Sequence, residues 1–238
     1  MKCNKASLYK SIKKLCCFGF VILSFNEPLF ADVVLFEDSF DGSSIDIDKW
    51  MVGTAEQANG RISGTIIAKP AFTTPYEIFG RITLPVSNVQ PQFVVHLRSS
   101  GWNYFSTGVP SFDISGIALA FANITPEGLG DVLILSDPHQ SPNPLAFPFF
   151  TSHGPISWNT NQENKIHIID DGSVIKLFVN NLEIFNVTTD YSVGSYVGFS
   201  AFDSFLNNVE INSVPEPSAL SLLAIGLGGL AMVRRRLS

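Results

Sequence analysis

Cysteine is absent from most of this chain. Its three cysteines, Cys3, Cys16 and Cys17, all lie within the first 17 residues. The rest of the chain therefore has no disulfide, no thiolate nucleophile and no thiolate metal site. A domain of this size can build its own hydrophobic core, so the lack of disulfides is compatible with export.

Charged residues are also scarce, at 15% of the chain, and many of the basic ones lie at its two ends. Between Asp32 and Ser213, seven Lys and Arg stand against nineteen Asp and Glu, a net charge of −12. This charge repels phosphate backbones and argues against nucleic acid as a partner. With 45% hydrophobic residues, the chain is not a disordered polyelectrolyte either.

The N-terminus has the pattern of a secretory signal. Residues 1–14 contain five lysines, and residues 15–25 form an apolar run that is too short to span a bilayer comfortably. Asn26, Glu27 and Pro28 interrupt this run, and Ala31 precedes the first acidic residue of the body. We predict a signal helix within residues 1–31, cleavage after Ala31 and export through the secretion translocon.

The C-terminus carries a second apolar segment. Residues 219–233 are uncharged and mostly apolar, and Arg234, Arg235 and Arg236 follow at once. A helix over 217–233 would be about 25 Å long, slightly short of a hydrocarbon core of about 30 Å. We predict a transmembrane helix over 217–233, with the arginines on the cytoplasmic side.

A short motif leads into this apolar segment and consists of Val214, Pro215, Glu216, Pro217 and Ser218. With the apolar helix and the three terminal arginines, residues 214–238 resemble the PEP-CTERM sorting signal of Gram-negative bacteria. The resemblance implies export, transient membrane anchoring, processing by an exosortase-type enzyme, and a final place at the cell surface or in the extracellular matrix of a biofilm. An ordinary C-terminal anchor is the alternative.

The body, residues 32–213, is rich in short strand-like segments separated by turn residues. The predicted strands cover residues 33–37, 61–69, 76–84, 92–98, 114–123, 131–135, 165–169, 174–179, 183–188, 196–202 and 208–212. No segment of the body has a sustained helical period. The body is therefore predicted to be all-β, as a two-sheet antiparallel β-sandwich.

Two turns and one loop stand out in this pattern. Asp171-Gly172 and Asn180-Asn181 tolerate positive φ, so residues 165–188 are predicted to form three consecutive antiparallel strands. Residues 138–164 hold many Pro, Asn and Ser and are predicted to be one long loop.

The two ends of the body resemble concanavalin-A-like, LamG-like jelly rolls. The resemblance rests on residues 36–42 (FEDSFDG) with Trp50, on the run around 171–180, on 197–202 (VGFSAF) and on the closing strand at 209–211. It implies the jelly-roll form of the sandwich.

The residues offer no catalytic motif. Some glycoside hydrolases of the resembled fold place carboxylates on one strand face as E-x-D-x-x-E, but residues 92–98 and 114–123 contain no Asp or Glu. G-x-S-x-G, H-E-x-x-H and a glycine-rich phosphate loop are also missing. His96, His139, His153 and His167 stand well apart. We assign no catalytic residue, and the sequence leans against an enzyme.

Two binding hypotheses follow. Many jelly rolls of the resembled type bind a structural calcium ion, and Glu37, Asp38 and Asp41 offer hard oxygen ligands, although the residues favour the alternative of a solvated acidic turn. Aromatic rings suit sugar faces, and the candidates for them are Trp102, Tyr104 and Phe105, with Trp158 at the end of the long loop. No cofactor other than this calcium is predicted.

The sequence therefore favours an exported, non-catalytic β-sandwich protein at the surface or in the matrix, with extracellular polysaccharide as its candidate ligand. The alternatives are a secreted carbohydrate-active hydrolase whose carboxylates come from separate strands, and a purely structural adhesin.

Overall fold

The structure, a computed structural model, describes residues 33–86, 92–101, 115–122, 124–136 and 150–214. Throughout these ranges the regular elements are β-strands, and every strand pair in them is antiparallel. The predicted all-β body is therefore confirmed. The predicted signal helix and transmembrane helix lie outside the described residues, within which no helix is long and apolar enough to cross a membrane.

Thirteen strands follow one another along the described part of the chain. They are β1 (Val33–Asp38), β2 (Trp50–Val52), β3 (Glu56–Ala58), β4 (Arg61–Ala68), β5 (Tyr76–Thr83), β6 (Phe93–Ser99), β7 (Ile117–Ala122), β8 (Leu129–Ser136), β9 (Phe150–Ser157), β10 (Glu163–Asp170), β11 (Val174–Val179), β12 (Leu182–Thr188) and β13 (Tyr196–Ser213).

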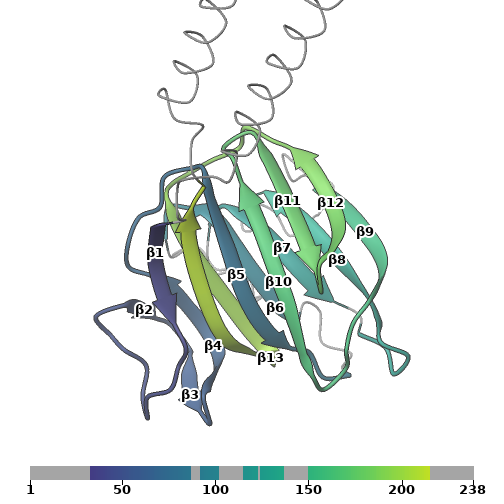
Figure 1. The fold of residues 1–238 in the computed structure, drawn as a ribbon, viewed down its shortest axis with the longest axis horizontal. Coiled ribbons are helices and arrows are strands. Elements are labelled where there is room, and N and C mark those ends of the chain that lie inside the picture. The colour runs from purple at the N-terminus through teal and green to yellow at the C-terminus, as the bar shows by residue number, and fades with distance from the viewer. Residues whose placement is uncertain (1–32, 87–91, 102–114, 123, 137–149, 215–238) are drawn as a thin grey trace, which may run out of the picture. The chain divides into compact units, whose positions relative to one another are not determined.

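The strands form two facing layers that share the long strand β13 (Figure 1). Layer A runs β12–β11–β10–β5–β13–β1, and layer B runs β9–β8–β7–β6–β13–β4, with β2 and β3 beside β4. The first half of β13 pairs with β6 and β4, and its second half pairs with β5 and β1. Register shifts between Ala201 and Asn208 mark the place where β13 passes from one layer to the other.

The main core fills the space between the layers. In β5, Tyr76, Ile78 and Ile82 point inward and are at most 2% exposed, whereas Glu77 and Arg81 point outward. This alternation is the period of two that a half-buried strand requires. Across the gap, layer B contributes apolar side chains from β6 and β7 to the same core.

The strands β6 and β7 are buried on both faces. Their outward side chains Val94, Ala118 and Ala120 form a second small apolar cluster with Leu135. Burial on both faces explains why β7 is a continuous apolar run rather than an alternating one, whereas the outward face of β6 also buries the polar side chains of His96 and Arg98.

The predicted hairpins are present, with β10, β11 and β12 in consecutive antiparallel pairing. Gly172, Asn180 and Asn181 have φ of 95°, 50° and 68°, as the turn residues predicted. The prediction of one long loop over 138–164 is wrong in part, because β9 occupies 150–157 and pairs with β8. Gly154 and Pro155 within β9 are residue types typical of loops, which explains the wrong prediction. The segments 196–202 and 208–212, predicted as separate strands, are parts of the single strand β13.

The first and last strands meet at one end of the domain. Val33 pairs with Ser213, and the N–H of Val214 donates to the carbonyl of Pro75. The β3–β4 turn and the last residues of β5 lie at the other end, at the bottom of Figure 1.

Candidate functional site

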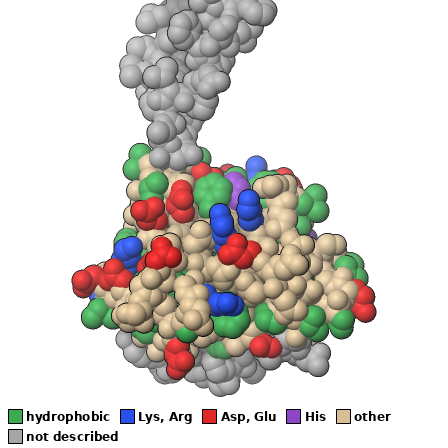
Figure 2. Space-filling view, turned by 60° about the horizontal axis from the view of Figure 1, so that its bottom comes forward, with side chains coloured by type: hydrophobic (Ala, Val, Ile, Leu, Met, Phe, Trp, Pro, Cys, Tyr) green, Lys and Arg blue, Asp and Glu red, His purple; other side chains and the backbone are tan. Residues whose placement is uncertain are grey.

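A polar groove lies at the end of the domain that carries the β3–β4 turn. Its volume is about 510 Å³. The groove forms beside the crossing of β13, where Asn207 is an extra residue in the pairing with β5 and Asn208 pairs with Arg81. The residues that line it are Ser39, Asp41, Asn59, Gly60, Arg61, Arg81, Thr83, Asn161, Gln162, Glu163, Asn207 and Asn208. Figure 2 turns this end toward the viewer, and uncharged side chains and backbone cover most of it.

Side-chain amides dominate the lining. Among the described residues, the amide groups of Asn59, Asn161, Gln162 and Asn208 make no hydrogen bond to protein. A planar amide has two donors and an acceptor with two lone pairs. Four such groups therefore give the groove a mixed set of donors and acceptors that the fold itself does not use.

A buried asparagine holds the turn that carries two of these amides. Asn164 is fully buried, and its carboxamide oxygen accepts the N–H of Asn159 at 2.8 Å. Its amide nitrogen donates to the carbonyls of Asn159 and Gln162 at 3.0 and 3.3 Å. Asn161 itself has φ of 57°. Asn164 therefore fixes the turn from which Asn161 and Gln162 reach the groove.

The groove also contains two carboxylates and two guanidinium groups. Asn207 donates to Glu163 Oε1 at 2.8 Å, and Arg81 donates to Glu163 Oε2 at 3.5 Å. The Asp41 carboxylate accepts the Ser39 hydroxyl at 2.6 Å. The guanidinium of Arg61 lies over the ring of Phe205, 4.7 Å from its centroid. These contacts leave the groove with balanced charge inside a strongly acidic body.

The structure corrects the prediction for one aromatic candidate. Trp158 is only 5% exposed and packs edge-on against Phe121, with ring centroids 5.3 Å apart. Its indole nitrogen is buried beside Gly130, where a side chain would collide with it. Trp158 is therefore a core residue and offers no ring face to a sugar. The other candidates, Trp102, Tyr104 and Phe105, lie outside the described residues.

The predicted calcium ligands have structural partners instead. Asp38 accepts the indole N–H of Trp50 at 2.7 Å and the backbone N–H of Phe40 at 2.9 Å. It thereby ties β1 to β2. In the described part of the chain, no group of three or more His, Cys, Asp or Glu side chains is placed to hold a metal ion. The structure does not gather Glu37, Asp38 and Asp41 into such a group.

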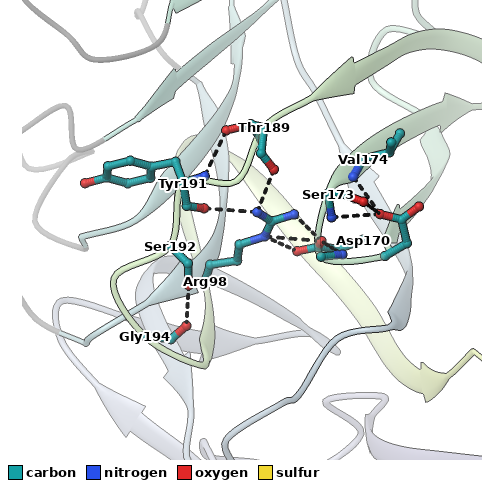
Figure 3. Close-up of polar contacts among 10 residues, drawn as sticks. Arg98, Asp170, Ser173, Val174, Thr189, Tyr191, Ser192 and Gly194 are labelled. Carbon is teal, nitrogen blue, oxygen red and sulfur yellow. Dashed lines mark hydrogen bonds and ion pairs between the residues drawn. The ribbon is translucent and has the colours of Figure 1, made fainter.

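A buried ion pair joins the two layers away from the groove (Figure 3). Arg98 of β6 donates two N–H groups to Asp170 of β10, at 2.6 Å from Nη2 and 2.9 Å from Nε. Its Nη1 donates to the carbonyls of Thr189 and Tyr191, each at 3.0 Å. Burial by itself would lower the pKa of Arg98, but the hydrogen bonds and charge of Asp170 raise it. The guanidinium therefore stays charged and anchors the loop before β13.

A buried histidine occupies the outward face of β6. His96 is fully buried, and its Nε2 lies 3.2 Å from the hydroxyl of Ser200. Burial lowers its pKa to about 3, so the ring is neutral at physiological pH. His96 is therefore a packed residue of the domain interior.

Sequence reasoning missed the groove because its residues come from five separate segments of the chain. The Asn59-Gly60 pair, a typical hairpin turn, would have located β3 and β4. No local pattern marks the remaining amides as neighbours.

Residues 213–236 match the family described as the PEP-CTERM protein-sorting motif. The chain therefore carries the predicted sorting signal, which marks an exported protein that its C-terminal region anchors transiently at the membrane. Of the matched residues, Ser213 and Val214 lie in the described range, and Pro215, Glu216, Pro217, Ser218 and the terminal arginines lie outside it. No curated protein sequence matches this chain.

Solved structures resemble the domain in fold. The potassium-bound carbohydrate recognition domain of Emp46p has a TM-score of 0.52 and 12% identity, over 71% of this chain and 91% of that one. The exoplasmic/lumenal domain of VIP36, bound to Ca²⁺ and Man3GlcNAc, has a TM-score of 0.54 and 10% identity, over 73% and 87%. The endo-β-1,3-glucanase of Pyrococcus furiosus has a TM-score of 0.52 and 13% identity, over 76% and 94%. At these identities the similarity shows the jelly-roll fold alone.

Proposed function

We propose that this chain is an exported, non-catalytic β-sandwich protein that binds carbohydrate in the amide-lined groove. The observation that carries the proposal is the set of four side-chain amides, on Asn59, Asn161, Gln162 and Asn208, that line one groove without a protein partner. Sugar hydroxyls both donate and accept hydrogen bonds, and a planar amide matches both roles. A few convergent polar groups in a concave site are typical of ligand recognition.

The fold and the position of the groove agree with this role. Two of the similar structures are named as, or bound as, carbohydrate-recognising domains. The groove includes Arg81 and Thr83 at one end of β5, whereas Val214, where the chain continues into the sorting motif, is hydrogen-bonded to Pro75 next to the other end of β5. Ligand binding in the groove therefore requires no contact with Val214, the last described residue.

The proposed setting is the cell surface or the extracellular matrix of a Gram-negative bacterium. The secretion translocon and an exosortase-type enzyme act on the chain in turn, with the second cutting near Pro-Glu-Pro. Extracellular polysaccharide of a biofilm is then the ligand that the released protein meets. The sorting motif at 213–236 supports this order of events.

From the sequence, we propose a second region that contacts the ligand. Trp102, Tyr104 and Phe105 follow Gly101, whose carbonyl accepts the N–H of Ser115 at 3.2 Å, so the two ends of that segment are joined at its base.

A hydrolase is the second candidate function, favoured by the similar glucanase and by Asp41 and Glu163 in one groove. A glycosidase needs two carboxyl groups roughly 5–9.5 Å apart. Both oxygens of Glu163 already accept hydrogen bonds from the protein, one from Asn207 and one from Arg81, which argues against a carboxyl group kept free for a reacting sugar. A structural adhesin that binds no glycan is the third candidate.

A glycan array tests the proposal. The full chain in detergent micelles is compared with an Asn161→Ala/Asn208→Ala variant, a Trp102→Ala variant and an Asn186→Ala control on exposed β12, with and without calcium. Binding that is lost only in the double variant supports the groove. Loss of glycan binding only in Trp102→Ala would place the binding site in the segment that contains Trp102. A folded protein that binds no glycan contradicts the proposal, and release of reducing ends would establish the hydrolase.

A further inference from the structure

The groove gathers arginine in a body that has very little of it. Between residues 32 and 213 there are three arginines, Arg61, Arg81 and Arg98. Arg98 is 3% exposed, and its guanidinium is bound in the ion pair with Asp170. Both remaining arginines line the groove. In a body with a net charge of −12, this placement of the two accessible guanidinium groups needs a reason.

Neither guanidinium is satisfied by the protein. Within the described residues, the Arg61 side chain makes no hydrogen bond, and its guanidinium lies over the ring of Phe205. That contact holds the guanidinium plane while leaving its N–H edge free. Arg81 makes one long hydrogen bond of 3.5 Å to Glu163, and both side chains are about half exposed. An exposed pair of this kind contributes little and leaves most of the five donors of Arg81 open.

A third cation stands beside Arg81. In the β5–β10 register Lys165 lies directly opposite Arg81, and both side chains point away from the core. Like charges directly opposite each other on a sheet destabilise it. Glu163 and Asp41 supply negative charge in the groove, but Glu163 is already bound by Asn207, and Asp41 accepts the hydroxyl of Ser39. An added anion near Arg81 would relieve the repulsion.

We propose that the groove recognises an acidic sugar, with the carboxylate of a hexuronate residue bound by Arg61 and Arg81 and the sugar hydroxyls bound by the neighbouring amides. This inference rests on the proposed carbohydrate-binding function and names its ligand class. Arginine suits the task because its planar fork binds both oxygens of a carboxylate. The polymer that fits is a polyuronate.

Isothermal titration calorimetry of the full chain in detergent micelles tests the proposal. The probes are short oligomers of galacturonate and mannuronate and their methyl esters, which keep the sugar and remove the charge. We expect at least one uronate to bind about tenfold or more tightly than its ester, since charged hydrogen bonds are stronger than neutral ones. Arg61→Gln or Arg81→Gln removes this preference, and Lys69→Gln, at the other end of β4, preserves it.

Two further variants separate recognition from folding. Arg61→Lys and Arg81→Lys keep the positive charge but lose the planar guanidinium, so we expect them to lose part of the preference for the uronate over its ester. Both variants are expected to melt at the temperature of the parent protein. Glu163→Gln removes a competing carboxylate and is expected to tighten uronate binding. An unchanged or weaker affinity in Glu163→Gln contradicts the assignment of Arg81.

Failure of this inference is distinguishable from failure of the proposed function. If uronates and esters bind equally, or only neutral oligosaccharides bind, the acidic-sugar inference is overturned and the carbohydrate-binding groove stands. If no oligosaccharide of either kind binds to the folded protein, both are overturned together.

Discussion

At the scale of single residues, the Arg98–Asp170 pair is the most deeply buried ion pair among the described residues. Both side chains are at most 4% exposed, and their bidentate contact crosses between the layers. Burial raises the pKa of the neighbouring Tyr76 hydroxyl well above its usual value, and the Asp170 carboxylate raises it further. Breaking a buried pair leaves an uncompensated charge, so Asp170→Asn is expected to cost about 3–5 kcal/mol of unfolding free energy.

Urea denaturation measures this cost, and Glu163→Gln is the matched control. Its pair with Arg81 is half exposed, so the control is expected to lose less than about 1 kcal/mol. Equal losses in the two variants would mean that the buried pair has no special role.

His96 predicts a pH dependence at the same scale. Its pKa is lowered from 6.5 to about 3 by burial, so in acid the unfolded chain takes up a proton that the folded chain refuses. This contribution to stability is complete above pH 6.5 and is lost as the pH falls toward 3, by up to about 1.4 kcal/mol per pH unit. The unfolding free energy of His96→Gln should fall less steeply between pH 6.5 and 4, and parallel slopes would contradict the assignment.

At the scale of elements, the sequence was sufficient to predict those strands and turns that depend on neighbouring residues in the chain. Strand-forming residues and the turns at Gly172 and Asn180-Asn181 were sufficient to place β10, β11 and β12. Short β2 and β3 were missed, because three residues hold too little pattern. The groove was also missed, because the crossing of β13 brings its amides together from distant segments.

The β11–β12 turn gives a prediction at this scale. Asn181 has φ of 68°, a conformation that glycine adopts without strain and a β-branched residue resists. Asn181→Gly is expected to gain about 0.5–1 kcal/mol, and Asn181→Val to lose about 1–2 kcal/mol. Thermal melts of the two variants should shift in opposite directions, and a destabilised Asn181→Gly would refute the turn geometry.

At the scale of the whole molecule, the sorting motif follows the folded domain without a spacer. β13 ends at Ser213, Val214 is still hydrogen-bonded to Pro75, and the motif match begins at residue 213. We expect Glu216→Ala to leave the domain folded and to retain the full-length chain in the membrane fraction. Immunoblotting of the exporting cell measures the processed form. Glu127→Ala, on an exposed residue of the domain, is the control and should be processed normally.

The most direct test of the carbohydrate-binding groove is a nuclear magnetic resonance titration of the side-chain amides. The full chain, labelled with ¹⁵N in detergent micelles, is titrated with neutral and uronic oligosaccharides. The predicted result is saturable shifts of the amide signals of Asn59, Asn161, Gln162 and Asn208, with the signal of Asn186 on β12 unmoved. Saturable binding that leaves these four signals in place and moves others would show that the ligand site lies elsewhere on the protein.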